Sequence, residues 1–185
     1  MKASATNIAG VVLIEPTVFG DARGFFVETF VQKSFDTAIG RHVEFVQDNH
    51  SRSSRGVLRG LHWQDAPHAQ GKLVRVTHGA VFDVAVDIRA GSSTFGRWYG
   101  VELSGENHRQ LWIEPGLAHG FLVLSASADF LYKATAYYAP AAERTICWDD
   151  ADLAIAWPDT GRAPVVSAKD AAGMSLAAWR DRGGG

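Results

Sequence analysis

Apolar and polar residues alternate with a period of two through much of this chain. The alternation is clearest from Val74 to Val76 and from Asp83 to Arg89, where Val or Ile occupies every second position. Side chains of a strand point alternately to its two faces, so this spacing predicts strands that are buried on one face. Further strand-like runs are Val11 to Ile14, Val43 to Val46, Trp98 to Leu103, Gln110 to Ile113, Phe121 to Leu124 and Phe130 to Tyr138.

Turn-forming residues separate these runs at short intervals. Glycine with serine, proline or aspartate follows most of them, as in Gly91-Ser92-Ser93 and Pro115-Gly116. Many short strands with frequent turns favour an all-β sandwich or barrel over alternating strand–helix units. Helical spacing is confined to Lys33 to Ile39 and Lys169 to Trp179, and residues 183–185 are expected to form a frayed tail. No linker or repeat is visible, so we expect a single domain over residues 1–185, with its core at about 8–176.

Composition and charge narrow the function. The 185 residues are 46% hydrophobic and 21% charged, as in globular domains. Lys and Arg total 18 against 20 acidic residues, so no overall charge attracts nucleic acid or membrane surfaces. The lone Cys147 excludes an internal disulfide. Glu15 and Pro16 follow the apolar run Ile8 to Ile14 without a small-residue cleavage site, so we predict a strand there and a cytoplasmic protein.

The motif search excludes several enzyme classes by their usual signatures. The chain contains no G-x-G-x-x-G, no Walker loop, no H-E-x-x-H and no G-x-S-x-G. Dinucleotide binding on a Rossmann unit, nucleotide hydrolysis and α/β-hydrolase chemistry therefore lose their sequence support.

A cluster of polar residues between Phe45 and Arg75 needs a functional explanation. His62 lies in the apolar context Leu61-His62-Trp63, where a histidine must find a hydrogen-bonding partner. From spacing alone it is equally a core histidine or a catalytic one. A metal-binding cupin would place a second histidine two residues on, but Gln64 stands there and is a poor ligand. With His119 this leaves two histidines and no carboxylate, fewer than a catalytic metal usually needs.

Longer motifs identify the chain as similar to the dTDP-4-dehydrorhamnose 3,5-epimerase family. The resemblance runs in order from about residue 8 to about residue 176. Ser93 and Glu114 depart from the family pattern, where proline is frequent, but both lie in turns. The motifs that carry it are Asp21 to Glu28, Phe45 to Asn49, Gly60 to Gln64, Gln70 to Val76, Asp83 to Arg89, Ser93 to Gly96, Pro115 to Phe121, Tyr132-Lys133, Tyr137-Tyr138, Glu143-Arg144, Ile155 to Pro158 and Ser167 to Asp170.

The resemblance implies a cupin-like double-stranded β-helix (jelly roll) with short flanking helices, and a homodimer that uses no metal and no cofactor. It implies that His62 is the base and Asp170 its orienting carboxylate. Tyr132 is the acid on the opposite face, and Lys72 stabilises the enolate oxygen. The structural alternatives are a helix cap for Asp170, a half-buried strand residue for Tyr132 and a strand-end lysine for Lys72.

The resemblance also implies which residues bind the dTDP-4-keto-6-deoxy sugar. Arginines clamp the diphosphate, polar groups and aromatic rings hold the nucleotide, and His119 shapes the sugar pocket. The substrate-binding set is Arg23, Arg59, Gln47, Asn49, Glu28, Phe19, Phe26, Tyr138, His119 and Glu143.

Several functions remain open on the sequence alone. The first is conversion of dTDP-4-dehydro-6-deoxy-D-glucose to dTDP-4-dehydro-L-rhamnose by inversion at C3 and C5. The second is a mono-epimerase of an antibiotic deoxysugar pathway, and a third is a keto-isomerase relative, against which Tyr132 argues. A metal-dependent cupin oxygenase and a non-catalytic sugar-binding module belong to other classes.

Overall fold

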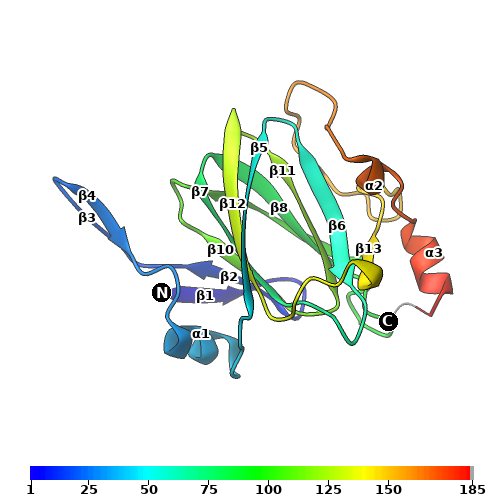
Figure 1. Ribbon diagram of the computed structural model, residues 1–185, viewed down its shortest axis with the longest axis horizontal. Helices are drawn as coiled ribbons and strands as arrows, with labels where there is room; N and C mark the ends of the chain where they lie inside the picture. The colour runs from blue at the N-terminus through cyan, green and yellow to red at the C-terminus, as the bar shows by residue number, and fades with distance from the viewer. Residues whose placement is uncertain (184–185) are drawn as a thin grey trace.

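The computed structural model describes residues 1–183, in which the strands form two packed sheets (Figure 1). Neighbouring strands within the sheets are antiparallel. The six-stranded sheet has the order β1 (Lys2–Ala5), β2 (Val11–Glu15), β10 (Gln110–Ile113), β7 (Lys72–His78), β12 (Ser127–Ala134) and β5 (Gln47–Ser54). The five-stranded sheet has the order β13 (Glu143–Thr145), β6 (Leu58–Gln64), β11 (Leu117–Val123), β8 (Ala80–Asp87) and β9 (Trp98–Ser104). The predicted all-β jelly roll is confirmed.

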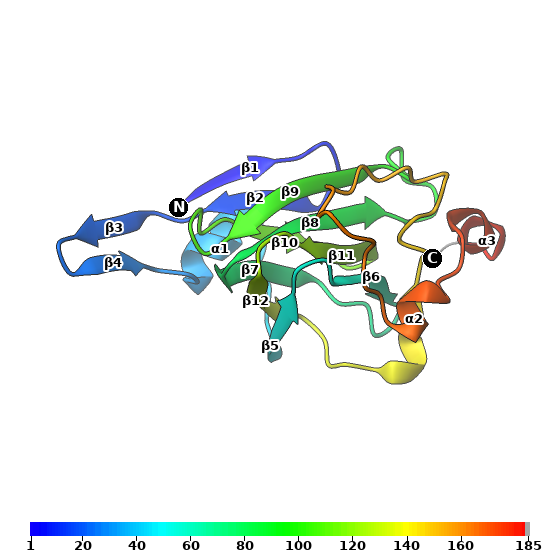
Figure 2. The same ribbon diagram turned by 90° about the horizontal axis from the view of Figure 1, so that it is seen from above.

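A separate two-stranded hairpin projects away from the sheets (Figures 1 and 2). It consists of β3 (Val18–Asp21) and β4 (Gly24–Val27), which pair only with each other. The helical elements are α1 (Gln32–Ile39), the 3₁₀ turn η1 (Pro140–Ala142), α2 (Ala168–Ala171) and α3 (Leu176–Asp181). No helix within residues 1–183 is long and apolar enough to span a membrane.

Three apolar clusters hold the elements together. One fills the space between the sheets and includes Val74, Leu111 and Phe130. A second lies under α1, where Phe35 packs against Trp112. The third covers the outer face of the five-stranded sheet with the C-terminal segment and contains residues such as Val84, Val86, Leu153, Leu176 and Trp179.

The third cluster changes one prediction. Strand β8 is not buried on one face only, because the C-terminal segment covers Val84 and Val86 on its outer side. On its inner side Asp83 is fully buried, and so is Asp87 near the end of the strand. The prediction of a half-buried strand is therefore wrong for β8, and its aspartates need partners inside the protein.

Two predicted elements are wrong. Val43 to Val46 forms no strand, because Val43 and Phe45 pack against the α1 cluster in an extended connection before β5. The predicted helix from Lys169 to Trp179 is divided into α2 and α3. Between them Met174 bridges to Ile146, and Gly173 approaches Cys147 so closely that an added Cβ would lie 2.7 Å from its backbone nitrogen.

The remaining predicted elements overlap the observed ones, some with shifted ends. Strand β10 and helix α1 lie where the pattern places them, and β2 and β9 each extend one residue further. Strand β11 begins earlier, and β12 ends at Ala134, after which residues 135–138 form a loop beside the pocket described below. Of the predicted frayed tail, residues 184 and 185 lie outside the described part of the chain.

Candidate active site

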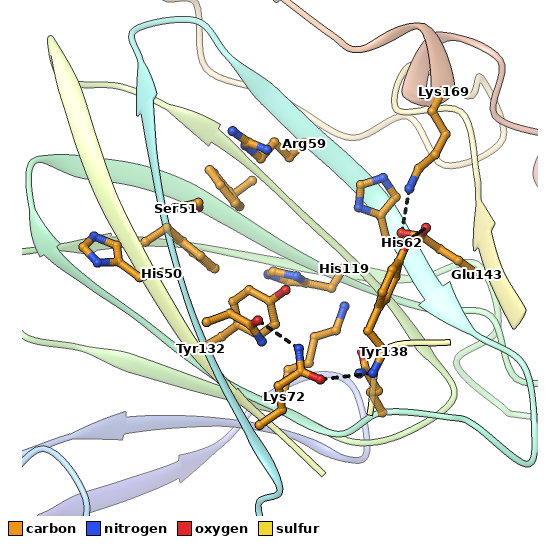
Figure 3. Close-up of a pocket in the computed structure, with 15 residues that line it drawn as sticks. His50, Ser51, Arg59, His62, Lys72, His119, Tyr132, Tyr138, Glu143 and Lys169 are labelled. Carbon is orange, nitrogen blue, oxygen red and sulfur yellow. Dashed lines mark hydrogen bonds and ion pairs between the residues drawn. The ribbon is translucent and has the colours of Figure 1, made fainter. Parts of the chain in front are cut away.

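A pocket of about 440 Å³ opens between the two sheets (Figure 3). Its walls come from β5, β7 and β12 on one side and from β6 and β11 on the other, with β13 and α2 at its rim. Nine predicted site residues line it: Gln47, Asn49, Arg59, His62, Lys72, His119, Tyr132, Tyr138 and Glu143. The fold therefore brings together most of the residues that the motifs selected.

His62 projects from β6 and is bonded to Asp170 of α2. His62 Nε2 lies 2.5 Å from Asp170 Oδ1. Ser167 caps α2 by accepting the Asp170 backbone N–H, so Asp170 does not serve as the cap. Burial alone would raise the pKa of Asp170, but hydrogen bonds and the charge of His62 hold that pKa below its ordinary value. The carboxylate thus fixes the ring through Nε2 and leaves Nδ1 as the nitrogen free to take a proton.

A second histidine–carboxylate pair lies beside the first. His119 on β11 is the register partner of His62 on β6, and its Nε2 lies 2.9 Å from Asp83 Oδ2. Both groups of this second pair are buried. Sequence analysis selected His119 for the pocket but not Asp83, whose role depends on the pairing of β8 with β11. His119 is therefore held in one orientation as part of the pocket wall.

Two glycines allow the histidine strands to approach each other. The register of β6 and β11 shifts between His119 and Phe121, next to Gly60 and Gly120. Gly60 has φ +129°, and a Cβ added there would lie 2.6 Å from the Gly120 Cα. Because any side chain would collide with the facing backbone, glycine is required at this contact. The close approach sets the positions of His62 and His119.

Lys72 and Tyr132 lie on the wall opposite His62. They belong to β7 and β12 of the six-stranded sheet, and Lys72 Nζ lies 6.0 Å from the centroid of the Tyr132 ring. Burial lowers the pKa of Lys72 to about 8. Burial likewise raises the pKa of Tyr132, so its hydroxyl keeps its proton at neutral pH. A proton acceptor and a proton donor thus face each other across the pocket.

A chain of polar contacts runs along the rim of the pocket. Gln47 donates to Asn49 Oδ1 over 2.9 Å and accepts the Tyr138 N–H over 3.0 Å. The Tyr138 hydroxyl donates to Glu143 Oε2 over 2.7 Å, and Lys169 Nζ lies 2.6 Å from Glu143 Oε1. Lys169 is a pocket residue that sequence analysis did not select, although it directly precedes Asp170 in a motif that was noted.

The Asn49 amide and the Arg59 guanidinium are available to bind a ligand in the pocket. Asn49 Nδ2 is buried and has no hydrogen-bond partner within the described residues, so it can donate to an acceptor in the pocket. Arg59 Nε donates to Ser53 Oγ over 3.0 Å, which orients its guanidinium at the pocket wall. Among the described residues, the lining carries the cations of Arg59, Lys72 and Lys169 but only the carboxylate of Glu143, which suits an anionic ligand.

Four predicted binding residues lie away from this pocket. Phe19, Arg23 and Phe26 belong to the projecting hairpin, where they line a shallow site of their own, and Glu28 directly follows β4. Phe19 and Phe26 are 58% and 64% exposed, and within residues 1–183 Arg23 is paired only with Asp21 of the same hairpin. The structure does not bring these residues to the pocket of their own chain (Figure 1).

Gln64, which stands where a metal-binding cupin would place a histidine, has other partners here. Gln64 donates to the carbonyls of His68 and Tyr137 and accepts the Ala139 N–H. Across residues 1–183 no group of three or more His, Cys, Asp or Glu side chains could hold a metal ion. Gln64 instead fastens the loop at residues 135–139 to the pocket.

Titratable groups on two opposite walls of one interior pocket are the arrangement that an epimerase requires. Residues 5–178 match the family model of dTDP-4-dehydrorhamnose 3,5-epimerase. A relative of that name from Pseudomonas aeruginosa is 59% identical over 177 residues, which cover 96% of this chain and 97% of the relative. The chain belongs to the dTDP-4-dehydrorhamnose 3,5-epimerase family, as its motifs predict.

Solved structures agree with this assignment. The epimerase RmlC from Legionella pneumophila, in complex with dTDP-4-keto-L-rhamnose, is 55% identical with a TM-score of 0.91. That match covers 95% of this chain and 93% of the Legionella chain. ChmJ, a 3'-monoepimerase from Streptomyces bikiniensis in complex with dTDP-quinovose, is 38% identical with a TM-score of 0.91, covering 96% and 89% of the two chains. Both are epimerases of the same jelly-roll fold.

Proposed function

We propose that this protein inverts C3 and C5 of dTDP-4-dehydro-6-deoxy-D-glucose to give dTDP-4-dehydro-L-rhamnose. The observation that carries the proposal is the placement of the His62–Asp170 pair and Tyr132 on opposite walls of one pocket. Inversion of a carbon centre requires a base on one face of the sugar ring and an acid on the other. The high identity to relatives named for this double inversion supports the same assignment.

The reaction uses the acidity that the 4-keto group gives to its neighbours. His62 Nδ1 removes the proton at C3 or C5, and the electron pair moves onto the keto oxygen to form an enolate. Asp170 stabilises the imidazolium that results. The Lys72 ammonium stabilises the enolate oxygen, and Tyr132 returns a proton to the opposite face of the carbon. The carbon centre is thereby inverted without transfer of a hydride, and proton exchange with solvent restores neutral His62 and protonated Tyr132 for the next inversion.

The remaining lining groups hold the nucleotide and the sugar. Arg59 is suited to the diphosphate because a guanidinium binds phosphate oxygens through two parallel hydrogen bonds. Gln47 and Asn49 hydrogen-bond the nucleotide, and Tyr138 offers a ring at the rim for stacking on thymine. His119 shapes the sugar pocket next to His62.

We infer that the protein acts as a homodimer in the cytoplasm. The hairpin carries exposed Phe19 and Phe26 with Arg23, and it projects too far from its own pocket to serve it. Exposed aromatic side chains on a projecting element are typical of a contact surface. The hairpin, with Glu28 at its base, therefore completes the nucleotide site of a second copy. No metal, cofactor, nucleic acid or membrane takes part.

A second candidate is inversion of one centre only. The structural similarity to ChmJ, a 3'-monoepimerase, supports this second candidate. Proton NMR of dTDP-4-keto-6-deoxyglucose in D₂O distinguishes the two, because double inversion exchanges and inverts both C3 and C5. Coupling to a reductase that accepts only the doubly inverted sugar gives an independent assay. Exchange and inversion at one carbon alone would contradict the proposed function.

A further inference from the structure

Glu143 is the single acidic side chain among the described residues that line the pocket. Its Oε1 is paired with Lys169 Nζ at 2.6 Å, and its Oε2 accepts the Tyr138 hydroxyl at 2.7 Å. Burial acts to raise the pKa of Glu143, but Lys169, Tyr138 and the charge of His62 hold that pKa below its ordinary value. A fixed negative charge therefore lies on the pocket wall, where the catalytic mechanism above gives it no step.

Lys72 is a half-buried cation without a direct partner among the described residues. No hydrogen bond or ion pair within 4.0 Å reaches its Nζ from any residue between 1 and 183. A buried ammonium without a partner tends to lose its proton. The charged and titratable groups that surround it are Glu143 on β13, Asp83 on β8, Lys169 on α2, His50 on β5, Arg59 and His62 on β6, His119 on β11, Tyr132 on β12 and Tyr138 in the loop after β12.

These neighbours act on Lys72 in opposite directions. The negative charges of Glu143 and Asp83 favour its protonated form, Glu143 more strongly, and the positive charge of Lys169 disfavours it. Asp83 is already bonded to His119, whereas Glu143 shares its charge with Lys169 at the rim. The Glu143–Lys169 pair is therefore placed to control the charge of a residue that neither of them touches.

We propose that Glu143 is a positioning residue that acts through Lys72: its carboxylate keeps Lys72 as an ammonium, and Lys169 limits that effect. This inference rests on the proposed function, in which the Lys72 ammonium stabilises the enolate. Glu143 thus maintains the charge required for catalysis without contacting the reacting carbon.

Two substitutions that break the same ion pair test the inference. Glu143→Gln keeps an oxygen for the Tyr138 hydroxyl but removes the negative charge, and Lys169→Met removes the positive charge. The high-pH limb of the kcat/KM profile follows the loss of the Lys72 proton. We expect this limb to move down by about one pH unit in Glu143→Gln and up in Lys169→Met. If the ion pair had a purely structural role, the high-pH limb would move in the same direction in both variants or would move in neither.

A direct titration makes the result independent of turnover. Lysine labelled with ¹³C at Cε reports the titration of each ammonium by NMR, and Lys72→Met assigns the relevant signal by its loss. The Lys72 titration should shift to lower pH in Glu143→Gln and to higher pH in Lys169→Met. Glu106→Gln, which removes a charge from an exposed turn, is the control and should leave the Lys72 signal unmoved. Equal or absent shifts in the two pocket variants would overturn the inference.

Each result remains interpretable if part of the experiment fails. If Glu143→Gln does not fold by circular dichroism, Lys169→Met alone still decides, because an unmoved or lowered titration contradicts the inference. If the wild-type protein does not invert the sugar, the proposed function fails, whereas the NMR titration still measures the effect of Glu143 on Lys72.

Discussion

His62 and His119 are register partners on neighbouring strands, and each is bonded to a carboxylate from a different element. Asp170 reaches His62 from helix α2, and Asp83 reaches His119 from β8. Both histidines line the pocket, but the His62 side chain is 23% exposed and the His119 side chain only 8%. The two pairs are alike in chemistry, and the greater exposure of His62 to the pocket favours it over His119 as the proposed base.

The first prediction concerns the base. His62→Ala should abolish exchange of the hydrogens at both C3 and C5, because without the base neither enolate forms. Loss of a general base usually lowers the rate by about 10²- to 10⁴-fold. Deuterium uptake from D₂O, followed by mass spectrometry, measures it. Normal uptake in a folded His62→Ala protein would assign the base to another residue.

The second prediction concerns the energetic cost of Lys72. Its pKa is lowered from 10.5 to about 8, so the folded state binds fewer protons than the unfolded state between these values. The charged form therefore destabilises the fold at pH 7, and this cost is relieved as the pH rises from about 8 to 10.5. Lys72→Met should abolish turnover yet raise Tm at pH 7 by about 2 °C or more.

The matching measurement is thermal unfolding of both proteins across the same range. The difference in Tm between Lys72→Met and wild type should shrink between pH 8 and pH 10.5. A Tm below that of wild type at pH 7 would show that Lys72 stabilises the fold, contrary to this account.

The third prediction tests the hairpin in trans. Arg23→Ala and His62→Ala should each be nearly inactive alone. If the hairpin of one copy completes the pocket of the other, a mixed dimer carries both defects at one site and leaves the second site intact. Mixing the variants after partial unfolding should therefore restore about a quarter of wild-type turnover, since half of the dimers are mixed and each has one intact site.

The same mixture gives the contrary result if the hairpin serves its own chain. Every site would then carry one defect, and no activity would return. A mixture of His62→Ala with Asp170→Asn is the matched control, because both substitutions lie in the same pocket and cannot complement.

Sequence patterns predicted strands that carry apolar residues and missed a strand that carries none. Strand β10 was located to the residue, but β5 (QDNHSRSS) has no apolar alternation and was not predicted. One of its faces lines the pocket and the other is largely exposed, so neither requires apolar residues. A binding strand of this kind lacks the signal that the alternation provides.

Sequence motifs alone predicted most of the residues that line the pocket. The motifs selected His62, Lys72, Tyr132 and the other predicted catalytic and binding residues, and the fold places most of them around one pocket. Asp83 was missed because its partner is determined by the pairing of β8 with β11, which local sequence does not reveal. The position of Arg23 away from the pocket could not be predicted either, because local sequence does not reveal that the hairpin projects from the sheets (Figure 2).

The fourth prediction concerns metal dependence. The pocket offers His62 and His119, but each has a carboxylate partner, and Gln64 holds a loop in place of a metal. Treatment with EDTA followed by gel filtration should leave turnover within about 20% of its initial value, since too few free ligands remain. Elemental analysis of the same sample provides the control. Loss of turnover that returns with an added divalent metal would contradict the cofactor-free mechanism.

The last prediction separates the acid from the base. Tyr132→Phe removes the phenol hydroxyl but keeps the ring, which packs against the core cluster beside Phe130. His62 and Asp170 remain, so the carbanion should still form, and His62 can return a solvent-derived proton to the original face. We therefore expect deuterium to enter at C3 or C5 while the yield of inverted sugar falls by about 10²-fold or more.

Mass uptake in D₂O and the yield of inverted sugar, measured on one sample, reveal this uncoupling. A tyrosine that only shapes the pocket would lower exchange and inversion by the same factor, because both would depend on how well the substrate is held. Opposite walls make the distinction possible: the base comes from the five-stranded sheet and the hydroxyl from the six-stranded sheet, so one can be removed while the other stays in place. Equal losses in the two measurements would give Tyr132 a binding role and require another proton donor on its side of the pocket.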